Sequence, residues 1–342
     1  MHISSRSAGI ALGVLVDAVV GDPRRGHPVA LFGRAAAALE RRLYGDARPN
    51  GVAHVAICVG AAAGLGALAS LAPERVLSGS PARLGGPAAR PASGRAGVVR
   101  AVVETGLTAA ATWAVLGGTT LAREGVHMAE ALEAKDIEAA RKRLPHLCGR
   151  DPRTLEAPEL ARATVESLAE NTSDAVVAPL FWGAIAGVPG LLAYRAVNTL
   201  DAMVGHRSPR YERFGWAAAR LDDVANYVPA RITGLLAVLA APDSRRALRV
   251  LRRDGHRHPS PNAGRCEAAF AGALDVTLGG VNVYGSRVEH RPEMGEGSRP
   301  EVRDIRRAVR LTRTVSLAAA AIAVLAPALW PRRARRSPAP GA

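Results

Sequence analysis

The chain is poor in aromatic residues, in lysine and in cysteine. Aromatic side chains make up 4% of its 342 residues, so no array of stacking rings for nucleic acid is present. The three cysteines, Cys58, Cys148 and Cys266, are isolated and lack a Cys/His spacing suited to zinc, so we expect reduced thiols. The first apolar run, residues 8–20, contains Asp17, and no small-residue cleavage pattern follows it. We therefore expect no cleavable signal peptide.

The charge of the chain is strongly one-sided. The formal net charge is +15, and almost all of the basic side chains are arginines. Such an excess suits the cytoplasmic loops of a membrane protein, a nucleic-acid surface or a site for anionic substrates. The arginines are spread through all polar segments and no nucleic-acid-binding motif appears, so we expect no nucleic-acid partner. The membrane and anionic-substrate interpretations are compatible with each other.

Long uncharged runs predict membrane-spanning helices. The run Gly51–Ala72 is long enough to cross a bilayer, and Val102–Ala122 is similar apart from Glu104 near one end. Leu311–Trp330 is a third candidate, and Tyr227–Ala241 is a shorter one. These runs predict an all-α, polytopic integral membrane protein of the cell membrane. We expect one integral membrane domain, with polar cytoplasmic loops and lipid around it.

One apolar stretch, residues 175–197, is interrupted by Gly187-Val188-Pro189-Gly190. A helix does not run smoothly through proline flanked by glycines. The pieces 175–186 and 191–202 are each too short to span a bilayer, which takes roughly 20 residues. A re-entrant hairpin or a broken helix buried in protein fits this pattern. A hairpin would return Asn198 and Asp201 to the side of Glu170 and Asp174, whereas a full crossing would separate them, and we favour the hairpin.

The remaining segments are polar. Residues 73–100 are rich in Pro, Gly, Ser and Arg and predict a flexible loop, and residues 123–145 predict a charged helix. Residues 242–310 predict a polar loop region that forms a second, soluble face. The basic tail, residues 331–342, is typical of a cytoplasmic end, although nearly every loop is basic and the charge distribution does not fix the topology.

Acids and carboxamides flank the interrupted stretch and form the main candidate site. Glu166, Glu170 and Asp174 lie four residues apart, which places them on one face of a helix with modest drift. Carboxylates this close repel one another, and a bound cation relieves the repulsion. The alternative is a solvated helix end with Asp174 as the cap of the next helix. The candidate catalytic residues are Glu166, Glu170, Asn171, Asp174, Asn198, Asp201, Asp222, Asp223 and Asn226.

Two further features of this block have structural alternatives. Asn198 and Asp201 could close the hairpin by hydrogen bonds rather than act in chemistry. Arg220 and Asp223 could form an ion pair at i,i+3, and Asp222 lies one helical turn from Asn226. An ion pair between Arg220 and Asp223 would not explain why a second carboxylate, Asp222, lies next to Asp223.

Near the N-terminus, Gly21-Asp22-Pro23 is followed by His27-Pro28-Val29. Asp-Pro is typical of a turn, and Pro28 suits the first position of a helix that runs to Leu43. A binding role for Asp22 and His27 is the alternative.

Two glycine-containing segments further along, residues 260–264 and 278–285, predict loops. Backbone N–H groups of such loops can bind phosphate, but neither segment is a Walker or Rossmann pattern. His256 and His258 flank Arg257 without a carboxylate partner in sequence, so we expect both histidines at the surface.

Taken together, these segments resemble the CobD/CbiB family, the adenosylcobinamide-phosphate synthases of cobalamin biosynthesis. The resemblance is carried by Gly21-Asp22-Pro23 with His27-Pro28-Val29, Val165–Asp174, Ala178–Trp182, Tyr194–Asp201, Phe214–Asn226 and Ser260–Gly264. It runs from about residue 12 to 330 and is weakest over 73–100. Ala175, where the family tends to have Gly, and Arg265, where an aromatic is common, are small departures.

The resemblance implies an integral membrane ligase that joins adenosylcobyric acid to (R)-1-amino-2-propanol O-phosphate, or threonine phosphate, using ATP. ATP would convert the carboxylate into an acyl phosphate, and Mg²⁺ would bridge the phosphates. The expected metal ligands are Glu170, Asp174, Asp201, Asp222 and Asp223. The expected substrate-binding residues are Asp22, His27, Arg195, Arg207, Arg220, Ser260, Asn262 and Tyr284.

Such an enzyme would have its active site on the cytoplasmic side. Association with other membrane enzymes of the cobalamin pathway would fit it, although no residue indicates such a partner. Two other classes stay open: a Mg²⁺-dependent membrane prenyltransferase, for which only fragments of the paired acidic motif appear, and a non-catalytic transporter or membrane partner.

Overall fold

The computed structural model describes residues 4–23, 26–77, 94–206, 208–284 and 287–329. Its α-helices are α1 (Ser5–Val20), α2 (Pro28–Leu43), α3 (Arg48–Leu77), α4 (Gly94–Val115), α5 (Gly118–Glu133), α6 (Ile137–Arg143), α7 (Ala157–Thr172), α8 (Ala178–Leu200), α9 (Trp216–Ala225), α10 (Tyr227–Ala240), α11 (Ser244–Asp254), α12 (Ala263–Leu274) and α13 (Val302–Leu329). Shorter elements are the 3₁₀ turn η1 (Leu144–His146), the π turns η2 (Ser173–Val177) and η3 (Asp201–Gly205), and the strands β1 (Leu278–Tyr284) and β2 (Arg287–Met294).

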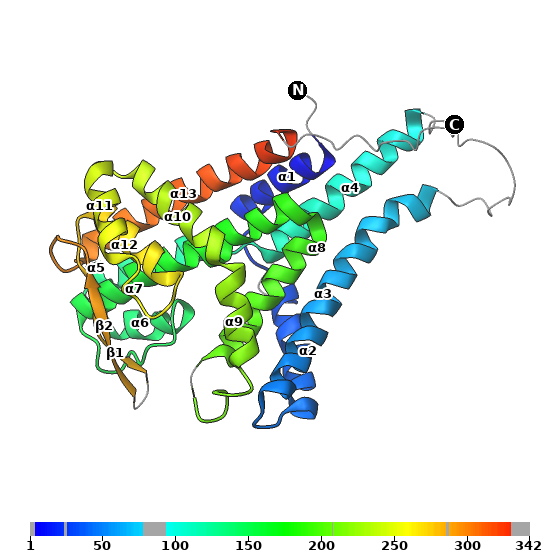
Figure 1. Ribbon diagram of the computed structural model, residues 1–342. Helices are drawn as coiled ribbons and strands as arrows, with labels where there is room; N and C mark the ends of the chain where they lie inside the picture. Colours follow the sequence, from blue (N-terminus) through cyan, green and yellow to red (C-terminus); the bar gives the residue numbers. More distant parts are fainter. Residues whose placement is uncertain (1–3, 24–25, 78–93, 207, 285–286, 330–342) are drawn as a thin grey trace, which may run out of the picture.

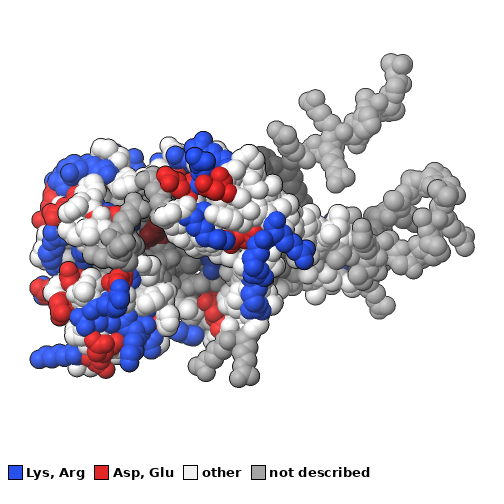
Figure 2. Space-filling model, turned by 90° about the horizontal axis from the view of Figure 1, so that it is seen from below, with Lys and Arg blue, Asp and Glu red and all other residues white. Residues whose placement is uncertain are grey.

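Four helical stretches are long and apolar enough to cross a membrane, which confirms the prediction of an all-α polytopic membrane protein. They are Arg48–Leu71, Ala96–Glu133, Ala157–Gly205 and Val302–Ala326. Only 22% of the apolar window is buried in each of the first two stretches, so most of their side chains face outward. In Figure 1, α3 and α4 extend from the rest of the molecule, and the corresponding part of Figure 2 is almost free of charge.

The boundaries of two expected helices were wrong. The run Val102–Ala122 does not form one helix, because α4 ends at Val115 and α5 begins after Leu116-Gly117. The charged segment 123–145 is likewise divided between α5 and α6, since Lys135 adopts a positive φ of 59°. Helix α10, over the shorter apolar run, has 14 residues and is too short to span.

Helix α8 is a hairpin, as the sequence predicted. Gly187 has φ 64° and ψ −146°, outside the helical region, and Pro189 follows it. The arms pack so closely that a Cβ added to Gly190 would lie 2.3 Å from the Trp182 carbonyl oxygen. Arg6 of α1 donates from Nη1 to the carbonyls of Ala184 and Ile185, both at 3.2 Å, at the end of the first arm.

The chain enters the hairpin without a new helix start. Helix α7 runs through η2 into the first arm of α8 with helical backbone angles at Thr172, Val177 and Ala178. Asp174 lies inside this π turn and does not cap a helix, so the interpretation of residues 166–174 as a capped helix end was wrong. Extra residues in π turns are frequent at functional sites.

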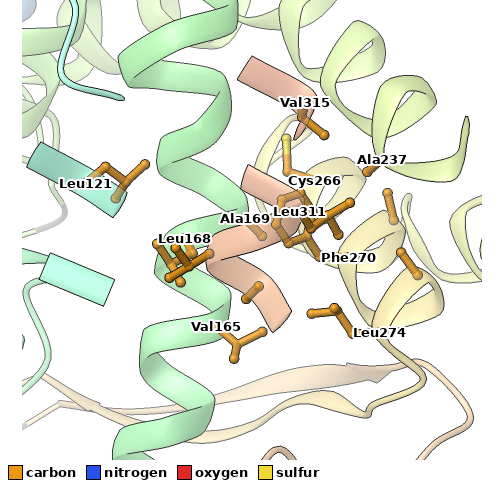
Figure 3. Close-up of a cluster of buried hydrophobic side chains, with 14 of the residues drawn as sticks. Leu121, Val165, Leu168, Ala169, Ala237, Cys266, Phe270, Leu274, Leu311 and Val315 are labelled. Atoms are coloured by element: carbon orange, nitrogen blue, oxygen red, sulfur yellow. The ribbon is translucent and has the colours of Figure 1, made fainter. Parts of the chain in front are cut away.

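The main hydrophobic core lies where α5, α7, α10, α12 and α13 meet (Figure 3). Figure 3 shows Leu311 of α13 beside Phe270 of α12 on one side of α7, and Leu168 of α7 on the side toward Leu121 of α5. Phe270 and Leu168 are fully buried, with 0% exposure. Helix α7 is thereby held on several sides, and it fixes the position of η2 and of the hairpin that follows.

Residues 242–310 are not a loop region. They form α11, α12, an antiparallel β1–β2 hairpin and the start of α13. Nearly every residue of α12 is buried, because its small Ala and Gly side chains allow close packing on all sides. Among the described residues, the Gly and Pro residues that indicated a loop instead lie in α12, in the strands and in the segments between elements.

The expected flexible loop and basic tail are only partly described. Residues 73–77 continue α3, and residues 94–100 begin α4, so the expected loop boundaries were wrong at both ends. Residues 78–93 and 331–342 lie outside the described residues.

Candidate functional site

The hairpin brings distant polar residues together at its open end. Asn198 Nδ2 donates to Asp174 Oδ2 at 3.3 Å, although 24 residues separate them. The Tyr194 hydroxyl donates to Asn226 Oδ1 at 2.9 Å and lies 3.3 Å from the Asp174 carbonyl oxygen. Both arms of α8 and helix α9 therefore meet at one place, which we call the acid cluster: Asp174, Asn198, Asp201, Asp222, Asp223 and Asn226.

Helix α9 contributes two adjacent carboxylates to the acid cluster. Asn226 Nδ2 donates to Asp222 Oδ2 at 3.0 Å, which confirms the expected one-turn pairing. Arg220 Nη1 lies 3.4 Å from Asp223 Oδ2, so the expected i,i+3 ion pair also forms. Because the Arg220 side chain is 66% exposed, this pair adds little stability. Asp222 has no ion pair with the described residues.

Asp222 has an environment that disfavours its charge. Burial, and then the negative charge of Asp201, raise the pKa of Asp222 to about 7. Its Oδ1 atom is buried and accepts no hydrogen bond from the described residues. A carboxylate of this kind gains by binding a cation or by taking up a proton.

Asp201 opens the second π turn, η3, directly after the hairpin. Its carboxylate lies against the Gly205 backbone, since a Cβ added to that glycine would meet Asp201 Oδ1 at 1.9 Å. The chain thus places an aspartate in each of its two π turns, Asp174 in η2 and Asp201 in η3. The altered helical register turns both toward α9.

Arg195 supplies positive charge beside the acid cluster. Its Nη1 donates to Asn198 Oδ1 at 3.3 Å, and the charges of Asp22 and Asp174 both act on it. Its Nε atom is buried and has no hydrogen-bond partner among the described residues. A guanidinium in this position suits a phosphate or acyl-phosphate oxygen.

The N-terminal motif contains the predicted helix start, whereas residues 24–25 of the predicted turn lie outside the described residues. Helix α2 runs from Pro28 to Leu43 as expected, and His27 caps it by accepting from Val29 N at 3.1 Å. His27 Nε2 lies 3.8 Å from Asp22 Oδ1. The cap uses one ring nitrogen of His27. Asp22 Oδ1 is buried and accepts no hydrogen bond from the described residues.

The five residues expected to bind a metal ion do not form a preassembled metal site in the described structure. Across the described ranges, no three His, Cys, Asp or Glu side chains lie close enough to hold a metal ion together. Mg²⁺ in phosphate-transfer sites takes only one or two carboxylates, with waters and phosphates completing its shell. The donor chemistry of Asp174 and Asp222, with the free oxygen of the latter, fits such a weakly held ion.

Glu166 lies outside the acid cluster, in a separate group of charged side chains. It forms ion pairs with Arg150 and with Arg162, and its Oε1 accepts from Gly279 N at 2.7 Å. Eight residues of α-helix rotate by about 80° beyond two full turns, so Glu166 and Asp174 do not face the same way. Glu170 lies between the two clusters and is exposed.

Asn171 points away from the acid cluster. Its Nδ2 donates to Ser167 O and Ser167 Oγ at 2.9 Å, and to Leu147 O at 3.3 Å. These bonds fasten α7 to the segment around η1. The geometry gives Asn171 a structural position, although the sequence placed it in the same motif as Glu170 and Asp174.

The residues expected to bind substrate around the Ser260 segment lie at the start of α12. Ser260 Oγ accepts from the backbone N–H groups of Asn262 and Ala263, and Asn262 Nδ2 donates to the Asp223 carbonyl at 2.8 Å. Asn262 thus holds the start of α12 against α9, whereas Ser260 caps the start of α12. Arg207 and the side chain of Tyr284 lie outside the described residues.

The expectation that His258 is a surface residue was wrong. His258 is buried, and its Nε2 lies 3.8 Å from Oε1 of the equally buried Glu267. Burial, with the positive charge of Arg291, lowers the pKa of His258 to about 4. His256 is exposed, as expected.

Several residues of the site were missed from the sequence. Tyr194 joins the hairpin to α9, and Arg150 balances Glu166. Glu267 has both carboxylate oxygens buried without a hydrogen bond. A lone acid within the otherwise uncharged segment 266–274 was the available signal for Glu267.

The chain is similar to known proteins over most of its length. The model of the family described as CobD/Cbib protein matches residues 10–312. The chain is 54% identical over 325 residues to "Cobalamin biosynthesis protein CobD" of Mycobacterium tuberculosis, covering 94% of this chain and 96% of that one. It is 41% identical to the protein of that name in Geobacter metallireducens and 40% identical to that of Stutzerimonas stutzeri, covering 87% of this chain in both and 89% and 90% of theirs. No solved structure gives a significant match.

The family model covers residues 10–312, which include every segment of the acid cluster, and the relatives cover most of the chain. The chain therefore belongs to the CobD/CbiB family.

Proposed function

We propose that this protein acts in cobalamin biosynthesis as an ATP-dependent amide ligase. The substrates would be adenosylcobyric acid and (R)-1-amino-2-propanol O-phosphate, or threonine phosphate, and the product adenosylcobinamide phosphate or its close relative. The observation that carries the proposal is the acid cluster, where the hairpin and α9 bring Asp174 and Asp222 together beside Arg195. The pathway follows from the names of the relatives.

The proposed reaction has two steps. A carboxylate of the corrinoid attacks the γ-phosphorus of ATP, which forms an acyl phosphate and releases ADP. The substrate amine then attacks the acyl carbon, and the amide forms as inorganic phosphate and a proton leave. The acyl phosphate makes the carbon electrophilic enough for the second step.

The residues of the acid cluster have distinct roles in this proposal. Arg195 stabilises negative charge on the phosphoryl group. Asp222 would hold Mg²⁺ together with Asp174, and because its pKa is about 7, a proton competes with the metal ion for this carboxylate. Tyr194 and Asn226 orient Asp222 through the hydrogen bonds described above.

Asp174 and Asp222 would hold Mg²⁺, with Asp201, Glu170 and Asp223 nearby. When bound, Mg²⁺ would neutralise the charge of the ATP phosphates. Because ATP is a cytoplasmic substrate, we propose that the acid cluster opens to the cytoplasmic side of the cell membrane.

A turnover assay tests this function. Membranes that contain the chain receive adenosylcobyric acid, aminopropanol phosphate, ATP and Mg²⁺, and corrinoid product and ADP are followed together. We expect equal amounts of product and ADP, with neither formed when Mg²⁺ is chelated. Asp174→Asn and Asp222→Asn should each lower kcat roughly 100-fold or more, as expected for loss of a charged ligand in a reaction centre.

The matched control for these variants is Glu212→Gln, which neutralises an exposed acid outside the acid cluster. It should retain the activity of the unmodified protein. If Asp174→Asn and Asp222→Asn inserted normally and also kept full activity, the assignment of the site would be wrong. If the unmodified protein gave no product with either amine, the ligase proposal itself would fail, and prenyl diphosphates would be the next substrates to test.

A further inference from the structure

A second cavity lies on the other side of η2 from Asp174. It has a volume of about 470 Å³ and is lined by residues of α1, α5, η2, α8 and α13 and by Leu116. Figure 1 shows α1 and α13 side by side at this part of the molecule. None of the residues proposed for ligation lines it, so the proposed reaction does not account for it.

The cavity has an apolar end. Val14 of α1, Leu317 and Ala320 of α13 and Leu180 of α8 line it there. Leu317 is 68% exposed, and it belongs to one of the four stretches that are apolar enough to cross a membrane. A hydrocarbon chain is therefore the natural occupant of this end.

The opposite end is polar and basic. Arg123 of α5 and Arg313 of α13 line it and are both exposed, and neither forms an ion pair with a carboxylate in the part of the chain that the structure describes. Both arginines lie where an apolar segment gives way to a polar one, since Arg313 precedes the uncharged run of α13 and Arg123 follows that of α4. Arginines at this level of a membrane protein attract anionic headgroups.

Two acceptor atoms in the cavity lack a donor. Asp17 is 6% exposed, and its Oδ2 accepts from Thr119 N and Oγ1, whereas its Oδ1 is buried without any hydrogen bond. Ser316 Oγ is likewise buried and unpartnered. Unsatisfied buried acceptors of this kind call for a hydrogen-bond donor from a ligand or water.

We infer that this cavity binds an anionic glycerophospholipid whose headgroup carries free hydroxyl groups, as phosphatidylglycerol does. Its phosphate lies between Arg123 and Arg313, its headgroup hydroxyls donate to Asp17 Oδ1 and Ser316 Oγ, and an acyl chain follows Val14 and Leu317. Two guanidinium groups and one carboxylate leave the cavity positively charged, which favours an anionic lipid over a zwitterionic one. The inference does not depend on the reaction proposed for the acid cluster.

The test measures lipid binding directly on the full-length protein in detergent. Phosphatidylglycerol, phosphatidylethanolamine and phosphatidylcholine are added separately, and bound lipid is counted by native mass spectrometry while the melting temperature is followed. We expect phosphatidylglycerol to bind at one saturable site and to raise the melting temperature more than the other two lipids.

Two variants locate the site. Arg123→Gln combined with Arg313→Gln should weaken phosphatidylglycerol binding roughly 10- to 30-fold, the loss expected for two cationic side chains near an anionic headgroup. Arg310→Gln is the matched control, because Arg310 is an exposed arginine of the same helix that does not line the cavity, and it should bind as the unmodified protein does. Ser316→Ala removes an unpartnered hydroxyl and should fold normally but bind less tightly.

Three results would overturn the inference. Equal binding of all three lipids, or equal binding by the double variant and Arg310→Gln, would show that the arginines do not select a headgroup. A preference for phosphatidylethanolamine would assign the Asp17 end to an ammonium group instead. Displacement of the lipid by inorganic phosphate at millimolar concentration would identify the cavity as a site for a soluble anion.

Discussion

At the scale of single residues, Asp222 is central to the proposed chemistry. Its neighbours supply a hydrogen bond to one carboxylate oxygen and leave the other oxygen without a partner. Because its pKa is about 7, the residue changes charge near physiological pH. Cation binding at the acid cluster should therefore depend on pH.

The direction of this dependence follows from proton linkage. The folded protein keeps the Asp222 proton up to about pH 7, whereas the unfolded chain releases it near the ordinary aspartate pKa of 3.8. Between these pH values the folded state binds more protons, so the contribution of Asp222 to stability falls as pH rises. Mg²⁺ competes with the same proton, so stabilisation by Mg²⁺ should grow from pH 6 to pH 8.

The measurement is the shift of melting temperature on adding Mg²⁺ at the two pH values. Asp222→Asn should remove the difference between pH 6 and pH 8, whereas Glu212→Gln should preserve it. An identical Mg²⁺ shift at both pH values in the unmodified protein would contradict the role of Asp222.

Tyr194 allows a second prediction at this scale. Tyr194→Phe removes only the hydroxyl that joins Asn226 to the hairpin. We expect a fall in kcat with little change in KM for ATP, and a stability loss of about 0.5–1.5 kcal/mol, the usual net value of one hydrogen bond. Tyr227→Phe, at an exposed tyrosine, is the control, and steady-state kinetics of both variants would check the prediction. Equal kcat in the two variants would count against a positioning role.

At the scale of elements, the hairpin of α8 determines whether the site forms. Its turn depends on Gly187, whose backbone angles lie in a region that other residues enter at a cost. Gly187→Ala should destabilise the fold by roughly 1–3 kcal/mol. Since the strain falls on the turn, the arms that carry Asp174 and Asn198 should separate and activity should fall as well.

Gly60→Ala is the matched control for Gly187→Ala. Gly60 is an exposed helical residue of α3 with open space around it, so alanine there should be neutral or slightly stabilising. Thermal unfolding in detergent and turnover in membranes measure both effects. A Gly187→Ala protein that matched Gly60→Ala in both assays would show that the turn needs no special backbone.

The elements also show what could be predicted from the sequence. The Gly-Val-Pro-Gly interruption predicted the hairpin, and Pro28 predicted the start of α2, because both depend on local backbone geometry. The fold of residues 242–310 was missed, because the burial of α12 comes from contacts with distant helices rather than from a local apolar pattern. The position of Glu166 was missed for the same reason, since its partner Gly279 is 113 residues away.

At the scale of the whole molecule, charge and apolar surface are separated. In Figure 2 the charged side chains gather over one part of the visible face and leave the extension that contains α3 and α4 almost uncharged. Leu68 on α3 is 58% exposed, which fits a side chain in contact with lipid. The separation matches a protein that is partly embedded in a bilayer.

Leu68→Arg should therefore reduce insertion into membranes. On the insertion scale a charged side chain in a spanning helix costs up to about 2.5–3.5 kcal/mol, the full cost applying at the helix centre. Val224→Arg is the control, because Val224 is 71% exposed but lies on α9, outside the four candidate spans. The amount of protein in washed membranes measures the effect, and equal amounts of the two variants would place α3 outside the bilayer.

The position of α13 in the core has a consequence for synthesis of the chain. Ile305, Ala308 and Val315 of this last helix are fully buried, with 0% exposure, and α13 packs against both α5 and α7. A growing chain therefore exposes the facing surfaces of α5 and α7 until the ribosome has completed nearly the whole protein. Contacts between such distant parts of a sequence form slowly, and exposed apolar surface favours aggregation in the meantime. Chains cut short before residue 302 should be recognised and degraded by the quality-control proteases of the host cell, because they lack α13 and expose the apolar surfaces that it covers.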